Sequence, residues 1–175
     1  MATELQQAKR PVSMLAGPYG HPFHPVLVTV PIGAWVASFV FDLASRWSAE
    51  PLVFAKGAYW LVGLGVAGAL AAAMFGFLDL VAIPTGTRAF RTGLLHMSLN
   101  LVVVTGFAGS FLLRRPRLGQ PDGVPIALIA LSAAALALLV VAGWLGGQLA
   151  YRYGVRVADE TAQADGYQTG RGPDG

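Results

Sequence analysis

Long stretches without charged residues alternate with short polar stretches along most of this chain. Four charge-free runs stand out: Pro25–Phe41 with 17 residues, Gly57–Leu78 and Thr92–Leu113 with 22 each, and Gly123–Tyr151 with 29. A helix that crosses the hydrocarbon core of a bilayer needs about 20 mostly apolar residues, with about 17 as the lower end. Barrel strands are shorter and alternate in polarity, so runs of this length favour helices. The pattern predicts four transmembrane helices, at about residues 25–45, 57–83, 91–113 and 124–147.

The polar stretches between these runs are short, which makes consecutive helices antiparallel neighbours. The expected fold is therefore all-α, an integral membrane four-helix antiparallel bundle. We divide the chain into a polar N-terminal segment (1–20), a transmembrane domain (21–157) and a disordered, Gly-rich C-terminal tail (158–175). The first segment lacks the apolar core and cleavage site of a signal peptide, so the first helix should remain as an anchor.

Composition narrows the classes of function. Hydrophobic residues make up 55% of the chain and charged residues only 12%, about half of the usual share of about 25%. A soluble enzyme or nucleic-acid-binding domain could not cover its surface with so few polar residues. The net charge of +3 comes from 12 scattered Lys and Arg that form no basic stripe. The predicted partner is the lipid bilayer, and no nucleic acid is expected.

The basic residues also bear on orientation. Seven of the 12 lie on the side of the two termini and five on the opposite side. The positive-inside rule then predicts cytoplasmic termini in a multi-pass protein of the bacterial inner membrane.

The chain has no cysteine, which excludes disulfides, thiolate zinc sites, iron–sulfur clusters held by cysteine and covalently attached c-type haem. Non-covalent haem b is compatible with this composition. Its candidate ligands are the three histidines, His21, His24 and His96.

Two of these histidines lie in the string GHPFHP before the first helix. Because each precedes a proline, His21 and His24 should both be extended. Pro25 suits the first helical position, where its missing N–H is not required. Pro31 is expected to kink the helix further in.

Antiparallel packing brings most of the unusual polar residues to one membrane face. They are His21, His24, Asp79, Arg88, Arg91, His96, Asn100, Gln148 and Tyr151. The other face has only Asp42 as a conspicuous acid, expected to reach the headgroups or to pair with Arg46.

Several roles remain open for this polar cluster. His96 and Asn100 are four residues apart and share one helix face. Ionisable groups in a membrane usually face the bundle interior. His96 could be tied to Asn100 and Asp79, could bind haem or a metal ion, or could belong to a proton path. Arg88 and Arg91 could pair with Asp79 or with lipid phosphates.

Small residues recur every four positions in two helices: Gly68, Ala72 and Gly76 in the second, Gly143 and Gly147 in the fourth. This spacing lets helix backbones approach closely in lipid. It indicates either packing within the bundle or a homodimer. No internal sequence repeat of the kind that marks many transporters is apparent.

Four stretches in this order resemble the bacterial family known as domain of unknown function 2231, four-helix membrane proteins with an HPxHP signature. They are GHPFHPVLVTVPIGAWVASFVFDL, GFLDL, RTGLLHMSLN and GWLGGQLAYRYGVRV, within residues 18–157. Relatives occur alone or joined to Rieske-type or cytochrome-like domains, so the resemblance implies a redox setting. The family usually has His after the paired Gly of the fourth helix, and here that position is Gln148.

Three functions follow as expectations. The first is a redox-associated membrane protein that binds b-type haem through His24 and His96, or His21, at one face. The second is a non-catalytic anchor or accessory subunit of a larger complex, which docks a redox partner protein. The third and weakest is transport. A stand-alone enzyme is the least expected, because no catalytic motif is present.

Overall fold

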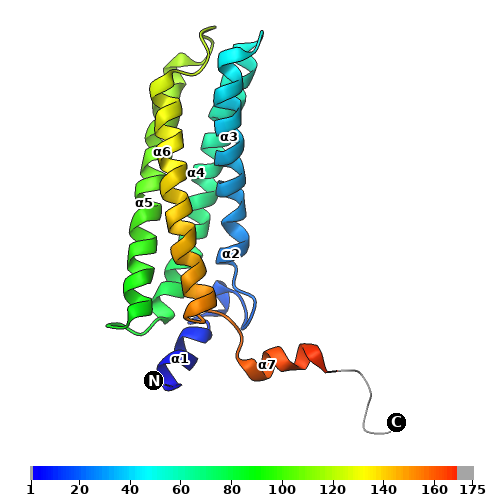
Figure 1. Ribbon diagram of the computed structural model, residues 1–175, viewed down its shortest axis with the longest axis vertical. Helices are drawn as coiled ribbons and strands as arrows, with labels where there is room; N and C mark the ends of the chain where they lie inside the picture. The colour runs from blue at the N-terminus through cyan, green and yellow to red at the C-terminus, as the bar shows by residue number, and fades with distance from the viewer. Residues whose placement is uncertain (1, 169–175) are drawn as a thin grey trace.

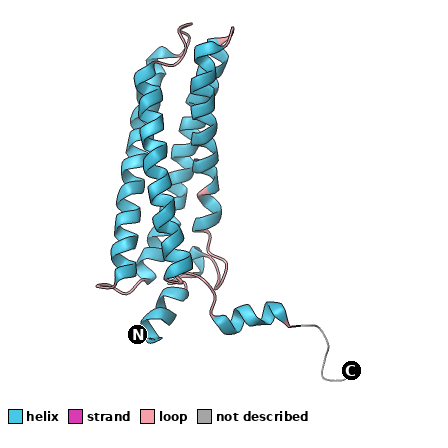
Figure 2. Cartoon of the chain, in the orientation of Figure 1, coloured by secondary structure: helices cyan, strands magenta, loops and turns pink. Residues whose placement is uncertain are grey.

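The computed structural model describes residues 2–168, in which no strand occurs (Figure 2). The elements are α1 (Ala2–Lys9), η1 (Met14–Ala16), α2 (His24–Leu27), α3 (Thr29–Trp47), α4 (Pro51–Ala82), α5 (Arg88–Arg114), η2 (Arg115–Arg117), α6 (Ile126–Gly147), the π-helical turn η3 (Gln148–Arg152), α7 (Glu160–Ala164) and η4 (Asp165–Tyr167). The long helices run up and down in one bundle (Figure 1). The predicted all-α four-helix bundle is confirmed.

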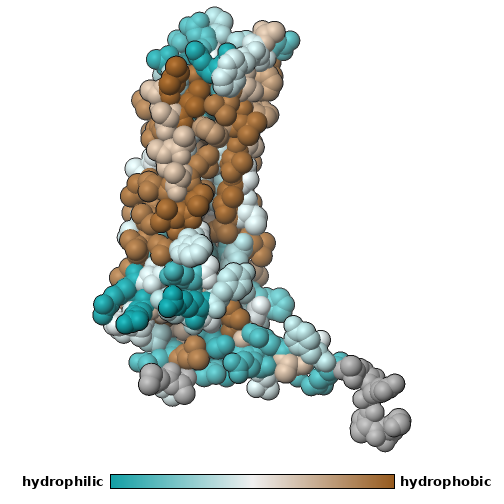
Figure 3. All heavy atoms as spheres, in the orientation of Figure 1, coloured by the Kyte–Doolittle hydropathy of each residue, from teal (hydrophilic) through white to brown (hydrophobic). Residues whose placement is uncertain are grey.

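Within residues 2–168, four helical segments are long and apolar enough to cross a membrane: His24–Trp47, Pro51–Ala82, Arg88–Arg117 and Ile126–Arg152. A hydrophobic band covers the middle of the bundle, and hydrophilic residues gather at both ends (Figure 3). This distribution suits a protein with lipid around its centre and water or headgroups at its ends.

The second and third long helices begin several residues before the charge-free runs do. Pro51 occupies the first turn of α4, where a proline costs no hydrogen bond. Thr87 caps α5, and its side chain accepts the backbone N–H of Phe90 at 3.1 Å. Lys56 and Arg88 therefore lie inside helices but near their ends, where a charge can reach the interface.

The first transmembrane segment is divided into α2 and α3 at Val28. Pro31 has no N–H to donate to the carbonyl of Leu27, which explains the interruption one turn earlier. The expected extended conformation of His24 is wrong, since His24 is the first residue of α2. Pro25, which follows it, is tolerated in the first turn of a helix. A hydrogen bond from the His24 ring to α4 holds His24 in this position.

The helices associate as two hairpins, α3 with α4 and α5 with α6, which then pack on each other. The core between the hairpins is built around Trp35 and Phe107, whose rings stack at 4.3 Å between centroids. Val62 and Val103 complete this centre and are fully buried. Side chains of the two hairpins therefore contact each other in the interior of the bundle.

Both terminal segments lie at the histidine-bearing end of the bundle (Figure 1). Ala8 of α1 packs with Leu80, Ile83 and Val155, which closes this end with apolar side chains. A disordered tail was expected from residue 158, but α7 forms there with Asp159 as its N-cap. The rest of that predicted tail, 169–175, lies outside the described residues.

Candidate functional site

His24 reaches from α2 to the backbone of α4. Its Nδ1 lies 2.9 Å from the carbonyl oxygen of Ala72. The imidazole packs on Gly76, one turn further along α4. A Cβ at that position would lie 2.8 Å from Cε1 and 2.9 Å from Nδ1 of His24. The absence of a side chain at Gly76 is therefore what allows the ring to reach the carbonyl.

His96 repeats this arrangement between α5 and α6. Its Nδ1 lies 2.8 Å from the carbonyl oxygen of Ala142. Gly146, again four residues after the acceptor, faces the ring, and a Cβ there would lie 3.1 Å from Cε1. Each histidine thus bonds a carbonyl of the partner helix in its own hairpin, next to a glycine.

The two imidazoles meet in the bundle interior, and with Asn100 we call them the histidine layer. Their ring centroids are 6.3 Å apart and their planes are nearly perpendicular, at 89°. Both side chains are partly buried. The Asn100 amide nitrogen donates to the His96 backbone oxygen at 2.8 Å. It lies 3.4 Å and 3.3 Å from the two ring nitrogens of His96, a position over the ring.

The hydrogen bonds determine the tautomer of both rings. A carbonyl oxygen only accepts, so each Nδ1 carries the proton and donates it. In a neutral imidazole the Nε2 nitrogen then keeps its lone pair. Histidines that bind metals are usually oriented by a hydrogen bond of this kind from the other ring nitrogen. Both rings can therefore act as ligands through Nε2.

Asp79 lies one turn beyond Gly76 on α4. Pairing with Arg88 or Arg91 was one of two alternatives for those arginines, but Asp79 pairs with Arg156 instead. Its Oδ1 is 2.7 Å from Nε of Arg156, without the alignment of a hydrogen bond. Arg156 follows the last transmembrane helix and is buried with a positive φ of 60°. Its Nη2 donates to the carbonyl oxygens of Ala16 and Gly17 at 3.0 and 2.9 Å.

Among the described residues, the other expected site residues make no hydrogen bond to the histidine layer. His21 is exposed, and its Nδ1 is 3.4 Å from the carbonyl of Tyr19. Arg88 and Arg91 are also exposed. Tyr151 is 92% exposed. Gln148, at the family His position, is partly buried at the start of η3.

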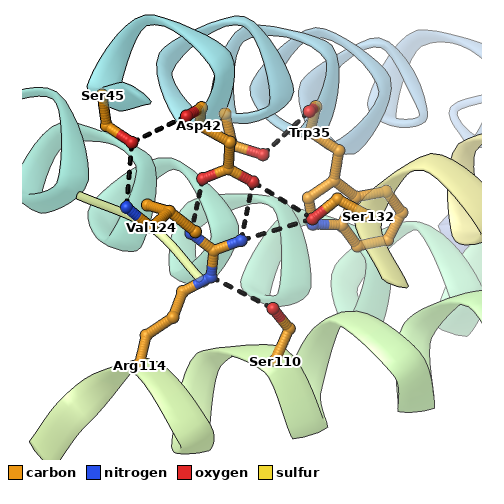
Figure 4. A network of polar contacts seen from close by, with 8 residues as sticks. Trp35, Asp42, Ser45, Ser110, Arg114, Val124 and Ser132 are labelled. Carbon is orange, nitrogen blue, oxygen red and sulfur yellow. Dashed lines mark hydrogen bonds and ion pairs between the residues drawn. The ribbon is translucent and has the colours of Figure 1, made fainter. Parts of the chain in front are cut away.

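A second polar cluster occupies the opposite end of the bundle (Figure 4). Asp42 is fully buried and receives both terminal nitrogens of Arg114, at 2.5 and 2.7 Å. Ser110 accepts from Nε of Arg114 at 3.1 Å, and Ser132 donates to Oδ2 of Asp42 at 3.2 Å. We call these four residues the ion-pair network.

The ion-pair network corrects the expected pairing of Asp42 with Arg46. Arg46 instead donates to the carbonyl of Asp122 at the exposed end of the bundle. Arg114 directly follows the third charge-free run, and its partner was not predicted from the sequence. One signal could have identified it: a buried aspartate in a membrane needs a cation, and Arg114 ends a helix that runs parallel to α3.

The glycine pattern is only partly explained by packing within the bundle. Gly68 faces Val30, and Gly76 faces His24, so the α4 glycines serve internal contacts. A Cβ added at Gly143 or at Gly147 would have no atom of another helix within 4 Å. The packing glycine of α6 is Gly146 instead.

Neither a curated protein nor a solved structure matches this chain significantly. The family model for predicted membrane proteins of domain of unknown function 2231 matches residues 20–159. That range contains the histidine layer, the ion-pair network and all four membrane-spanning segments. The chain therefore belongs to this family of predicted membrane proteins.

Proposed function

We propose that the protein is a membrane electron carrier that binds one b-type haem between His24 and His96. The observation that carries this proposal is the pair of Nδ1–H bonds to Ala72 and Ala142, which leaves two Nε2 lone pairs in one layer. Histidine is a common haem ligand, and His24 and His96 would be the residues that hold haem b here. The two rings are also close enough to act together, with their centroids 6.3 Å apart.

The separation of the rings fits one shared metal. Two imidazoles that share a metal, each through one nitrogen at about 2 Å, place their ring centres at most about 6 Å apart. The observed value is 6.3 Å. A bare metal ion is a poorer fit, because no group of three or more His, Cys, Asp or Glu within residues 2–168 could hold one. Haem would need fewer protein ligands than a bare ion, and His24 and His96 could hold it.

This chain's own residues would set the properties of the site. The two carbonyl bonds orient the imidazoles and raise their basicity. The amide of Asn100 over the His96 ring limits how that ring can rotate. Haem, when bound, supplies reversible one-electron chemistry. The partner of such a carrier is a redox protein at the histidine-bearing face.

A pigment spectrum tests the proposal. The protein is purified from haem-replete cells, and the dithionite-reduced minus oxidised spectrum is recorded. We expect Soret and α-band signals from the wild type and their loss in His24→Gln and His96→Gln. His21→Gln is the matched control and should keep the pigment, because His21 is exposed. A colourless wild type would overturn the haem site and leave the anchor role, tested by co-purification of a partner in mild detergent.

We also propose that both termini face the cytoplasm of a bacterial inner membrane. The support is the excess of Lys and Arg on the terminal side, seven against five. Green fluorescent protein fused after residue 168 should fluoresce, and alkaline phosphatase fused there should be inactive. The reverse pair of results would invert the orientation.

A further inference from the structure

The two hairpins share a register that extends through the whole bundle. In α2, α3 and α5, corresponding residues are 72 positions apart: His24 and His96, Pro31 and Val103, Trp35 and Phe107, Ser38 and Ser110, Asp42 and Arg114. Apart from the two partly buried histidines, every one of these residues is buried. A common spacing at five levels is not required by hydropathy, because apolar helices can pack in many registers.

The second helices of the hairpins correspond at a spacing of 70. The pairs are Ala58 and Leu128, Val62 and Ser132, Gly65 and Ala135, Ala72 and Ala142, and Gly76 and Gly146. The last two pairs are the carbonyl acceptors and packing glycines of the two histidines. The change from 72 to 70 means that the second hairpin has two residues fewer between its equivalent positions.

Equivalent residues also touch each other across the bundle. The rings of His24 and His96 are 6.3 Å apart, those of Trp35 and Phe107 stack at 4.3 Å, and Asp42 binds Arg114. In a twofold assembly, residues near the axis meet their own equivalents. The α3 and α5 helices run in the same direction, so such an axis runs along the bundle (Figure 1).

We infer that the protein consists of two helical-hairpin repeats, residues 24–82 and 96–152, related by a twofold axis along the bundle. The axis passes through the histidine layer, the aromatic pair and the ion-pair network. The histidine layer is then one binding site to which each repeat contributes an equivalent donor. It would suit a ligand whose two faces are chemically alike, as those of a planar metal chelate are. That consequence rests on the proposed haem site, whereas the repeat itself does not.

The layer around the aromatic pair offers a direct test. In one hairpin a large ring packs on a glycine, and in the other a smaller ring packs on an alanine. Trp35 lies against Gly65, where an added Cβ would collide with the indole nitrogen Nε1. The equivalent positions hold the smaller Phe107 and the larger Ala135. A repeat predicts that the layer can be exchanged between the hairpins only as a whole.

The test compares three variants of the full chain with the wild type by thermal melting in detergent, without added ligand. W35F/F107W should melt at least ~5 °C below the wild type, because the new indole meets the Cβ of Ala135. Adding G65A and A135G should return the melting temperature to within ~3 °C of the wild type. A composition-matched control, W35F/G65A/F107W/A133G, places the glycine on an exposed position of α6 and should remain destabilised. The inferred repeat would be overturned if the melting temperature of the fourfold variant were not higher than that of the twofold variant.

The ion pair gives a second, independent measurement. In the wild type, Ser110 bonds Arg114, while its equivalent Ser38 bonds only the carbonyl of Trp35. Ser110→Ala should therefore lower the melting temperature more than Ser38→Ala. In D42R/R114D the order should reverse, because the arginine now belongs to the first repeat. The inference would be contradicted if the two serine variants kept the same order of melting temperatures in D42R/R114D. It would also be contradicted if D42R/R114D were no more stable than D42R or R114D alone. Absence of pigment would not affect either result.

Discussion

Two glycines determine how closely the histidines approach the neighbouring helices. A backbone carbonyl inside a helix already accepts the N–H four residues on, and the side chain at that residue normally shields it. At Gly76 and Gly146 no Cβ is present, so an imidazole can bond the same carbonyl. The spacing of small residues indicated close packing, but only the structure identifies the group that packs there.

Gly76→Ala should therefore disturb the His24 site. The new Cβ would lie 2.8 Å from the ring, and crowding of this kind costs about 1–3 kcal/mol of unfolding free energy. Gly146→Ala should cost less, because its closest contact is 3.1 Å. Denaturant titration followed by circular dichroism measures both.

Gly143→Ala is the matched control on the same helix as Gly146. No atom of another helix lies within 4 Å of its added Cβ, so the change should be neutral or stabilise the helix by up to ~1 kcal/mol. Equal losses in all three variants would mean that close approach to the imidazoles is not what the glycines provide.

At the scale of elements, α3 and α5 are joined by side chains rather than by backbone contact. The ion-pair network crosses the bundle from Asp42 to Arg114, with hydroxyl groups on both sides (Figure 4). A buried pair is stable only when its remaining hydrogen-bonding groups are also satisfied. Ser110 and Ser132 supply those bonds from α5 and α6.

Asp42→Ala should destabilise the bundle by about 3–5 kcal/mol, because it leaves the charge of Arg114 buried without a partner. Replacing both residues, as in D42L/R114M, should restore most of this free energy, since well-packed apolar residues can substitute for a buried pair. Unfolding curves of the two variants in detergent provide the comparison. If the double variant were as unstable as Asp42→Ala, the cause of the destabilisation would be the lost hydrogen bonds to the serines and not the unpaired charge of Arg114.

At the scale of the whole molecule, the segments before and after the bundle close its histidine-bearing end. Arg156 links the N-terminal segment to α4, because it bonds the carbonyls of Ala16 and Gly17 and pairs with Asp79. Its own backbone N–H donates to the carbonyl of Ala8 at 3.0 Å. One arginine after the last membrane segment thus holds three distant parts of the chain together.

Arg156→Ala should release the N-terminal segment while leaving the transmembrane helices intact. Trypsin cleavage after Lys9 should accelerate, by about tenfold for each ~1.4 kcal/mol of lost local stability. Arg152→Ala is the control, since Arg152 is an exposed cation one turn earlier. Cleavage at the wild-type rate in Arg156→Ala would refute this closing role.

The sequence by itself was sufficient for the number of spans, their approximate bounds and the shared face of His96 and Asn100. These features depend on hydropathy and on spacing within one helix, which are local. Only the tertiary structure decided that His24 bonds Ala72, that Asp79 pairs with Arg156 and that Asp42 pairs with Arg114. Those contacts join residues 48, 77 and 72 positions apart. They depend on the rotation and register of whole helices, and the hydrophobic pattern of a lipid-exposed helix leaves both undetermined.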